Sequence, residues 1–233
     1  IILFLKTVKY LKKKQLLYLI YRRIKFNFVS KKINFYKINK ITLLAKPIYK
    51  TTKLTNNNYF KFLNIERKID LNIDWNCKNY EKLWLYNLHY FDDLNSKNNY
   101  LKYEIHQNYI NKWIKNNPPF IGNGWEPFTV SLRIVNWIKY HLDFNLTKSQ
   151  LDSLYLQARY LFNNIEYHLL GNHLISNCKA LIYAGLLYDC QESRKWLVKG
   201  LKILLNELEE QILNDGGHYE LSTMYHALIV EDL

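Results

Sequence analysis

The sequence predicts a mainly α-helical fold built from antiparallel helical hairpins. Apolar residues recur with a helical period in successive segments from Trp84 onward, and only short links separate these segments. The chain has 7 Gly and 4 Pro, too few for a turn-rich all-β fold. Hydrophobic residues make up 48% of the 233 positions, so the chain can bury a sizeable core. No repeat of a usual solenoid length recurs, and we therefore do not expect a regular solenoid.

The first 74 residues differ in character from the rest. Residues 1–26 have the pattern of a basic amphipathic helix. Residues 27–75 are rich in Lys and Asn, with short β-leaning pieces around residues 26–38 and 59–75 and a turn at the asparagines 56–58. We expect residues 1–74 to form a basic N-terminal arm followed by a poorly packed lead-in segment, and residues 75–233 to form the helical domain.

Helix-breaking and helix-capping residues set the expected helix boundaries. Asn117-Pro118-Pro119 ends one helix, Thr147 caps another, and Gly171 separates two more. The glycines of "NDGGHYE" (214–220) mark a turn. After an aromatic-rich segment at 84–94, the expected helices span residues 100–115, 128–142, 148–170, 172–188, 192–213 and 221–233.

The positive charge is concentrated at the N-terminus. The formal net charge is +13, yet the 65 residues before Glu66 hold 16 Lys and Arg and no carboxylate, while the remainder has 17 basic and 20 acidic residues, a balance of −3. A coding bias toward Lys accounts for the total but not for the missing acids. We interpret residues 1–26 as a candidate for binding an anionic membrane surface or acidic glycan. The equally weighted alternative is that the apolar face packs onto the helical domain. Nucleic acid ranks last, because no nucleic-acid-binding module is recognised.

The remaining composition points to no cofactor. Cys77, Cys178 and Cys190 form no CxxC pair, so we expect neither a disulfide framework nor a zinc site, and no metal or other cofactor is identifiable. No apolar run is long enough to cross a bilayer, and the opening residues lack the features of a signal peptide. The chain starts at Ile1 and stops within an apolar helical pattern, and we interpret it as a piece of a longer protein.

Polar and aromatic side chains concentrate in loops and at helix starts, where functional residues are common. Each also has a structural interpretation. Asn172 can cap the helix after Gly171, Tyr225 can be an ordinary helix residue, and Arg133 can pair with Glu126 or Glu220. The concentrations are "YNLHYFDDL" (86–94), "GNGWEPFTVSLRIVNWI" (122–138), and the pair "LLGNHLISN" (169–177) with "DGGHYELSTMYHAL" (215–228).

These motifs occur in an order and spacing that resembles the N-terminal helical domain of the heparinase II/III-like polysaccharide lyase superfamily. That superfamily includes heparan-sulfate lyases and alginate lyases, and the match is close from about Trp75 to Leu233. The resemblance implies an incomplete α/α toroid of helical hairpins. It also implies a downstream β-sandwich domain, absent from this sequence, with the substrate groove between the two. A location in the periplasm or cell envelope follows from the same resemblance.

The resemblance further implies cleavage of uronate-containing polysaccharide by β-elimination. Asn172 and His173 fall on the family's "GNH", and Tyr225 falls on the tyrosine of "ELSxMYH"; these are the expected catalytic residues. The family's second catalytic His or Tyr, in the downstream domain, has no position here, so we expect this chain alone to be inactive. The expected substrate-binding residues are His89, Trp125, Glu126, Arg133, Trp137, His218 and Glu220.

The chemistry explains why such groups are needed. The C5 proton removed in β-elimination is weakly acidic while the neighbouring carboxylate keeps its charge, and hydrogen bonds from Asn172 and His173 would stabilise the developing aci-carboxylate. Tyr225 would take the C5 proton or protonate the departing O4, and the acid role is slightly favoured because a tyrosine hydroxyl already carries its proton. Trp125 and Trp137 could stack on sugar rings, and Arg133 could pair with a carboxylate or sulfate.

Two other functions compete with an enzyme. The first is a non-catalytic glycan-binding or assembly protein on the same fold, in capsule or O-antigen production. The second is a peripheral membrane scaffold that uses the basic arm.

Overall fold

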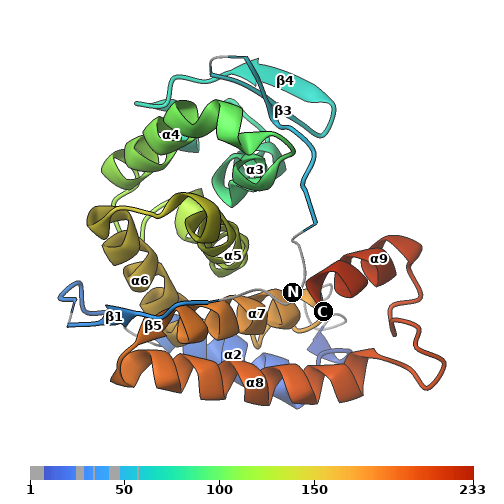
Figure 1. Ribbon diagram of the computed structural model, residues 1–233. Helices are drawn as coiled ribbons and strands as arrows, with labels where there is room; N and C mark the ends of the chain where they lie inside the picture. Colours follow the sequence, from blue (N-terminus) through green and yellow to red (C-terminus); the bar gives the residue numbers. More distant parts are fainter. Residues whose placement is uncertain (1–7, 25–28, 34, 42–47, 57) are drawn as a thin grey trace.

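The computed structural model describes residues 8–24, 29–33, 35–41, 48–56 and 58–233, and within them the chain is mainly helical, as the sequence predicts. Figure 1 shows α5 at the centre, with α3 and α4 on one side, α7 and α8 on the other, and α6 connecting the two sides. The incomplete toroid and the boundary at residues 74–75 stay predictions.

The described helices are α2 (Lys13–Ile24), α3 (Lys82–Tyr90), α4 (Tyr103–Asn116), α5 (Pro127–Phe144), α6 (Lys148–Asn163), α7 (Asn172–Leu187), α8 (Gln191–Gln211) and α9 (Thr223–Asp232). The 3-10 turns are η1 (Asp74–Asn76), η2 (Asp92–Asn95), η3 (Asn99–Lys102) and η4 (Asn123–Trp125).

In the part of the chain that the structure describes, two small antiparallel sheets flank the helices. Strands β2 (Leu54–Asn56), β3 (Tyr59–Phe62) and β4 (Ile65–Lys68) form one sheet, and β1 (Lys37–Ile38) pairs with β5 (Tyr188–Asp189) in the other. Phe60 and Phe62 are buried, and their rings lie 5.1 Å from Tyr109 and 5.0 Å from Trp84. The expectation of a poorly packed lead-in segment is therefore wrong, because β3 alternates exposed and buried residues and buries its aromatic face against α3 and α4.

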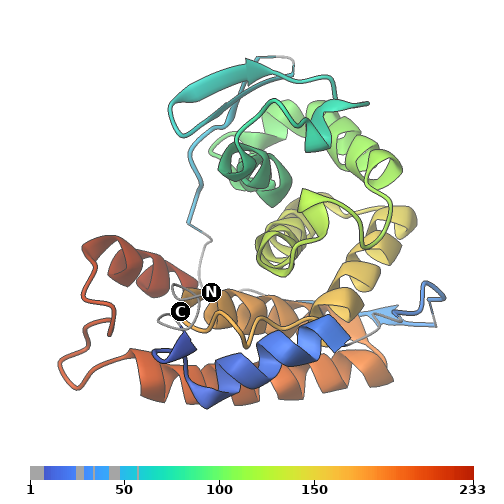
Figure 2. The ribbon, with the colours of Figure 1, turned by 180° about the vertical axis from the view of Figure 1, so that it is seen from behind.

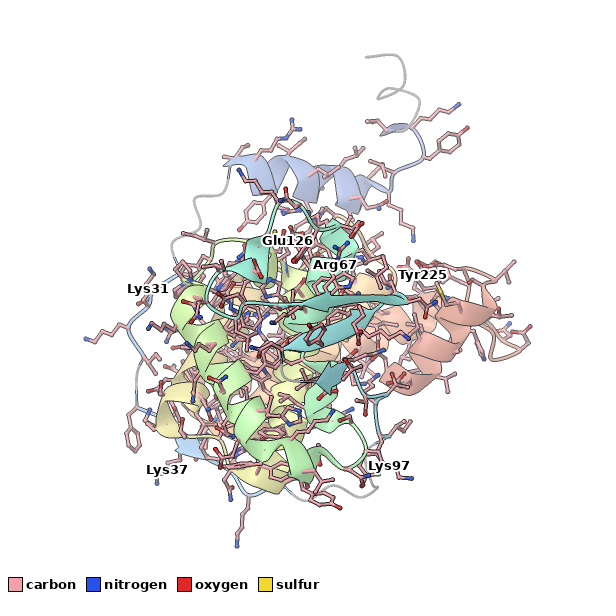
Figure 3. All side chains as sticks on the ribbon, turned by 90° about the horizontal axis from the view of Figure 1, so that it is seen from above. Lys31, Lys37, Arg67, Lys97, Glu126 and Tyr225 are labelled. Atoms are coloured by element: carbon pink, nitrogen blue, oxygen red, sulfur yellow. The ribbon has the colours of Figure 1, made fainter. Side chains whose placement is uncertain are left out.

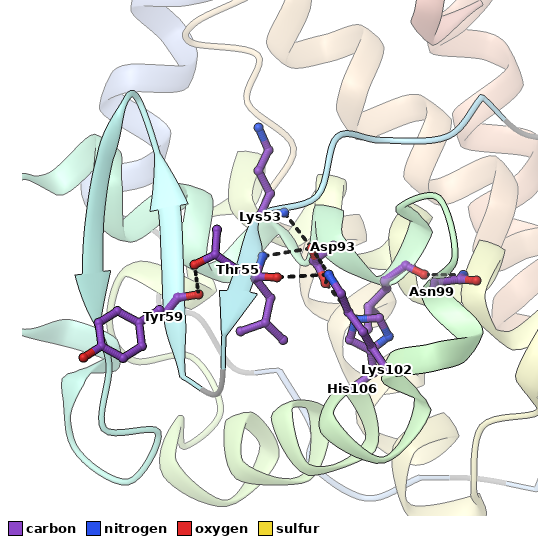
Figure 4. Close-up of polar contacts among 9 residues, drawn as sticks. Lys53, Thr55, Tyr59, Asp93, Asn99, Lys102 and His106 are labelled. Atoms are coloured by element: carbon purple, nitrogen blue, oxygen red, sulfur yellow. Dashed lines mark hydrogen bonds and ion pairs between the residues drawn. The ribbon is translucent and has the colours of Figure 1, made fainter.

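A buried carboxylate attaches this sheet to the helices (Figure 4). Asp93 of η2 is 2% exposed, and its Oδ1 accepts the backbone N–H groups of Lys53 and Leu54 at 2.6 and 2.9 Å. Its Oδ2 lies 2.8 Å from His106 Nε2 and 3.1 Å from Lys102 Nζ. Burial alone would raise the pKa of Asp93, but the hydrogen bonds from His106 and the two backbone groups hold the pKa below its ordinary value.

The helices α7 and α8 form a tightly packed hairpin because two glycines face the contact. A Cβ at Gly185 would lie 2.7 Å from the backbone nitrogen of Leu197, and a Cβ at Gly200 would lie 3.0 Å from the carbonyl oxygen of Cys178. Neither position has room for a side chain, so the two backbones approach closely where only glycine fits. This hairpin carries the N-terminus of α7, where the predicted catalytic pair lies.

Most helix starts follow the sequence signals, with two corrections. Thr147 caps α6 through a capping box with Gln150, as expected. The helix ends at Asn163 rather than Leu170, because the side chains of Asn163 and Asn164 bond back to carbonyl groups of the last turn. The cap of α7 is Gly171, with Asn172 as the first helical residue, so the interpretation of Asn172 as a cap is wrong.

The N-terminal arm contributes the helix α2, which Figures 1 and 2 show lying along the outside of the α7–α8 layer. Of the predicted helix at 1–26, residues 1–7 and 25–26 lie outside the described residues. Within the described ranges, no helix combines the length and the apolar character needed to cross a membrane.

Candidate functional site

A cleft of about 280 Å³ lies where α5, α7 and α9 meet. Side chains from all three helices line it, together with residues of α3 and the segment before β2. We call it the α5–α7–α9 cleft, and the residues that matter most for its chemistry are Lys50, Tyr90, Lys139, Asn172, Lys179 and Glu231.

Asn172 lines the cleft from the first position of α7. The turn before it requires Gly171, whose φ is +57° and whose added Cβ would lie 3.1 Å from Glu220 Oε1. The carbonyl oxygen of Gly171 accepts a 3.0 Å hydrogen bond from Gln211 Nε2. The start of α7 is thus fixed by α8 and the 215–220 turn, and the unpaired backbone N–H groups of a helix start favour a bound anion near Asn172.

His173 is oriented by a buried glutamate that the sequence analysis did not single out. Glu166 is 5% exposed, and its Oε2 lies 3.2 Å from His173 Nδ1 and 3.1 Å from Asn177 Nδ2. The imidazole also packs on Phe128, a cleft residue, with 4.5 Å between ring centroids. Because a carboxylate only accepts hydrogen bonds, Nδ1 carries the proton in this contact, and Nε2 is left for a substrate.

Tyr225 lies near the start of α9, and Figure 3 shows it at the side of the molecule formed by this helix. Its backbone N–H is 3.5 Å from the capping Ser222 Oγ. Helical spacing places Tyr225 on the same face as Leu228 and Asp232, which line the cleft. Among the described residues its hydroxyl contacts neither Asn172 nor His173, so the convergence of all three stays a prediction.

Five of the predicted substrate-binding residues are buried instead of lining a surface. His89, Arg133 and Trp137 have no exposed surface, His218 is 2% exposed and Trp125 is 3% exposed. A sugar cannot stack on a ring that lies entirely inside the core, so the expectation of direct contact is not met for these side chains. Arg133 forms no ion pair with Glu126 or Glu220; it donates to Gln157, Gly124 and His89 and lies over the Trp113 ring at 3.9 Å.

The core histidine His89 is held neutral by its surroundings. Its Nε2 lies 2.9 Å from the carbonyl oxygen of Trp75, and its Nδ1 accepts from Trp113 Nε1 at 2.9 Å. Burial and the nearby Arg133 charge lower the pKa of His89 to about 3. His89 and Arg133 therefore hold α3 and α5 together through hydrogen bonds inside the core, and neither side chain is exposed to bind an anion.

The buried His218 and the remaining two predicted binding residues, Glu126 and Glu220, lie near loops. Glu126, labelled in Figure 3, directly precedes α5, and its carboxylate accepts from Tyr86 and from Lys82 Nζ, the latter at 2.8 Å. His218 is 2% exposed and bonds Gln211 Oε1 at 3.1 Å, which holds the turn before α9. Glu220 lies beside Gly171, so it belongs to the support of the α7 start.

Three lysines line the cleft together with the acids Asp92, Glu231 and Asp232, and the sequence analysis missed all three lysines. Lys50 pairs with Glu231, and Lys179 lies 3.1 Å from Asp232 Oδ1, both acids being on α9. Lys139 has no ion pair or hydrogen bond among the described residues. Burial, and then the charges of Lys179 and Lys50, lower the pKa of Lys139. The sequence signal was Lys139 itself, the only lysine of α5, which directly follows the apolar Trp137 and Ile138.

Comparison with known proteins now decides the family. The family described as Heparinase II/III N-terminus matches residues 5–233. The chain belongs to this family. No solved structure matches the chain.

Several curated relatives are heparin-sulfate lyases. The protein of Bacteroides thetaiotaomicron is 36% identical over 142 residues, which is 55% of this chain and 20% of the relative. That of Bacteroides stercoris is 27% identical over 113 residues, 46% of this chain and 17% of the relative. That of Pedobacter heparinus is 30% identical over 82 residues, 35% of this chain and 12% of the relative. The matches span a fifth or less of these relatives.

Membership of the Heparinase II/III N-terminus family confirms the resemblance drawn from the motifs. It also places the α5–α7–α9 cleft in the N-terminal region of a polysaccharide lyase family. Within the described residues, no three His, Cys, Asp or Glu side chains gather as metal ligands would.

Proposed function

We propose that this chain supplies the helical side of an active site that cleaves uronate-containing acidic polysaccharide by β-elimination. The observation that carries the proposal is the position of Asn172 and His173 at the N-terminus of α7, beside a cleft with three lysines. Similarity to heparin-sulfate lyases supports an acidic polysaccharide as the substrate class.

The first task of the site is to stabilise charge on the uronate carboxylate. Removal of the C5 proton moves electrons into that carboxylate, and donors already aimed at it lower the barrier most. The Asn172 amide and the free N–H groups at the start of α7 are such donors. His173 adds an Nε2–H donor in its imidazolium form, in which both ring nitrogens carry hydrogen and Nδ1–H donates to Glu166. Lys139, which has no ion pair among the described residues, would attract a carboxylate or sulfate group of a neighbouring sugar, whereas Lys179 is paired with Asp232.

The second task is proton transfer. In β-elimination the C5–H and C4–O4 bonds break, a C4=C5 double bond forms, and O4 leaves with a proton. In our proposal Tyr225 gives its hydroxyl proton to O4 and later regains one from water. The base that takes the C5 proton would be a side chain outside residues 1–233. Tyr225 as that base is the less favoured arrangement, since it must first lose its own proton.

A non-catalytic glycan-binding role, for example in capsule or O-antigen assembly at the cell envelope, is the second candidate. The observation that favours it is the lack of contact between the Tyr225 hydroxyl and the Asn172–His173 pair among the described residues. Binding of an acidic glycan through Lys139 and the start of α7 would require no proton transfer.

The deciding experiment compares residues 1–233 with the complete protein on heparan sulfate and alginate. Formation of the unsaturated uronate is followed by its ultraviolet absorbance, and binding is measured in parallel. We expect the complete protein to produce the double bond and residues 1–233 alone to bind glycan with little or no cleavage. Binding without cleavage by the complete protein would select the non-catalytic role. Efficient cleavage by residues 1–233 alone would refute the proposal that the base lies outside these residues.

A further inference from the structure

The helix α2 attaches to the domain through one polar and aromatic side. Gln15 Nε2 donates to the carbonyl oxygen of His168 at 3.3 Å, and the ring of Tyr18 lies 4.5 Å from that of Tyr167. Arg22 donates to the side chain of His168. Positions 15, 18 and 22 share one helical face, so this face is the docked one.

The opposite side of α2 presents apolar residues to solvent. Leu17, Ile20 and Ile24 follow each other at helical spacing and are 66%, 58% and 69% exposed. No residue of α2 is buried, and Leu17 also borders an open cavity of about 520 Å³ beside the 162–167 segment. Figure 2 shows α2 in front of the α7–α8 layer, at the surface of the molecule. The alternative in which the apolar face packs onto the domain does not hold for Leu17, Ile20 and Ile24, whereas Tyr18 does pack against the core.

Basic side chains flank the exposed apolar residues. Lys13 and Arg23 are exposed and have no side-chain partner among the described residues, whereas Lys12 pairs with Glu210. The whole stretch before Glu66 contains no carboxylate. Figure 3 shows Lys31 and Lys37 of the same arm at the outer edge of the molecule.

We propose that α2 binds the surface of an anionic lipid bilayer, lying in its plane, with Leu17, Ile20 and Ile24 among the acyl chains and Lys13 and Arg23 at the head-group phosphates. An exposed apolar stripe between basic residues is the pattern of an interfacial helix. A second copy of α2 would bring like charges together, which disfavours self-association through this face. Acidic glycan would leave the apolar stripe in water. The inference stands independently of the lyase proposal.

The test uses the complete protein and co-sedimentation with phosphatidylcholine vesicles that either contain or lack phosphatidylserine. We expect binding only to vesicles with phosphatidylserine. The variant Leu17→Ser/Ile20→Ser/Ile24→Ser should abolish it, and Lys13→Gln/Arg23→Gln should weaken it by about fivefold per charge at low salt. Circular dichroism and glycan binding should stay as in the unchanged protein, because none of these side chains is buried.

The chain offers a matched control on α8. Val198, Leu201 and Leu205 have the same spacing as Leu17, Ile20 and Ile24 and are 68%, 43% and 63% exposed. Val198→Ser/Leu201→Ser/Leu205→Ser should leave vesicle binding unchanged. Equal loss from the α8 control, binding unaffected by the α2 variant, or equal binding to both kinds of vesicle would each overturn the proposal. Concentration-dependent dimerisation that the α2 variant abolishes, without vesicle binding, would assign the stripe to a second copy instead.

Discussion

Glu166 holds His173 in place, with Oε2 of the buried carboxylate 3.2 Å from Nδ1 of the imidazole. The same oxygen accepts from Asn177 Nδ2, and Asn177 Oδ1 accepts the backbone N–H of Glu166 in return. Asn177 also donates to Ser131 Oγ on α5 at 3.0 Å. This chain of contacts links α5, α7 and the 164–170 connection, so the direction of His173 depends on three parts of the fold.

Replacing Glu166 tests whether this orientation matters for the proposed reaction. Glu166→Gln keeps the size of the side chain but replaces the carboxylate with an amide that can present a donor to Nδ1. We expect the activity of the complete protein to fall by about tenfold to a hundredfold, the range usual for loss of a group that orients a ligating or catalytic histidine. Thermal unfolding should change much less than in Glu166→Ala, which leaves one buried N–H of the Asn177 amide unpaired and costs about 1–3 kcal/mol. Activity unchanged in Glu166→Gln would show that His173 does not depend on this contact.

Tyr225→Phe distinguishes a catalytic role of the Tyr225 hydroxyl from a purely structural role of this residue. The change removes one hydroxyl that has no hydrogen-bond partner among the described residues, so folding should be nearly unchanged. If Tyr225 protonates O4, the rate in the complete protein should fall by about a hundredfold to ten-thousandfold. Tyr183→Phe on α7 is the matched control, since it removes the hydroxyl of another half-buried tyrosine outside the cleft lining. Full activity in Tyr225→Phe would assign the acid role to another group.

The helical part of the fold could be predicted because its signals are local. Helical periodicity, the Thr147 cap and the break at Gly171 all act within a few residues, and each is present in the structure. The end of α6 was misplaced because Asn163 and Asn164 terminate it through side-chain bonds to its own last turn, whereas periodicity alone continued to Leu170.

The site was harder to predict than the fold. Motifs pointed to Asn172 and His173, but burial depends on which helices pack together, and it moved His89, Arg133 and Trp137 into the core. Lys50 and Lys139 are 89 positions apart in the sequence, and only the tertiary fold brings both into the lining of one cleft. Glu166 lies three residues before the "LLGNHLISN" motif (169–177), yet only its burial beside His173 reveals a positioning role.

Lys139→Met should raise stability and weaken glycan binding together. Because the pKa of Lys139 is lowered in the folded state, the unfolded chain holds more protons between that pKa and the ordinary value of 10.5. Stability therefore rises with pH across this window and is reduced below it. Removing the charge should abolish this pH dependence and raise the melting temperature at neutral pH. It should also lower affinity for heparan sulfate, most strongly at low salt.

The exposed Lys202 of α8 provides the matched control for Lys139. Lys202→Met should leave both the melting temperature and glycan affinity close to those of the unchanged protein. A lower melting temperature for Lys139→Met would contradict the view that the buried charge of Lys139 costs stability. Glycan affinity that falls equally in both variants would contradict a role of Lys139 in binding glycan.

Asp93→Asn should detach the three-stranded sheet from the helices. The carboxylate accepts from Lys53, Leu54, Lys102 and His106, and an amide oxygen cannot serve all four donors. Leaving buried donors unpaired costs about 1–3 kcal/mol of unfolding free energy.

The folded pKa of Asp93 lies below 3.8, so the contribution of this carboxylate to stability is present above that pH and is lost as pH falls through the folded pKa. Denaturant unfolding from neutral to acid pH should therefore show the two proteins becoming more alike as pH falls. Asp143→Asn, at an exposed position, should stay within about 0.5 kcal/mol of the unchanged protein throughout. A constant difference between Asp93→Asn and the unchanged protein at all pH values would show that the lost charge is not what destabilises the variant.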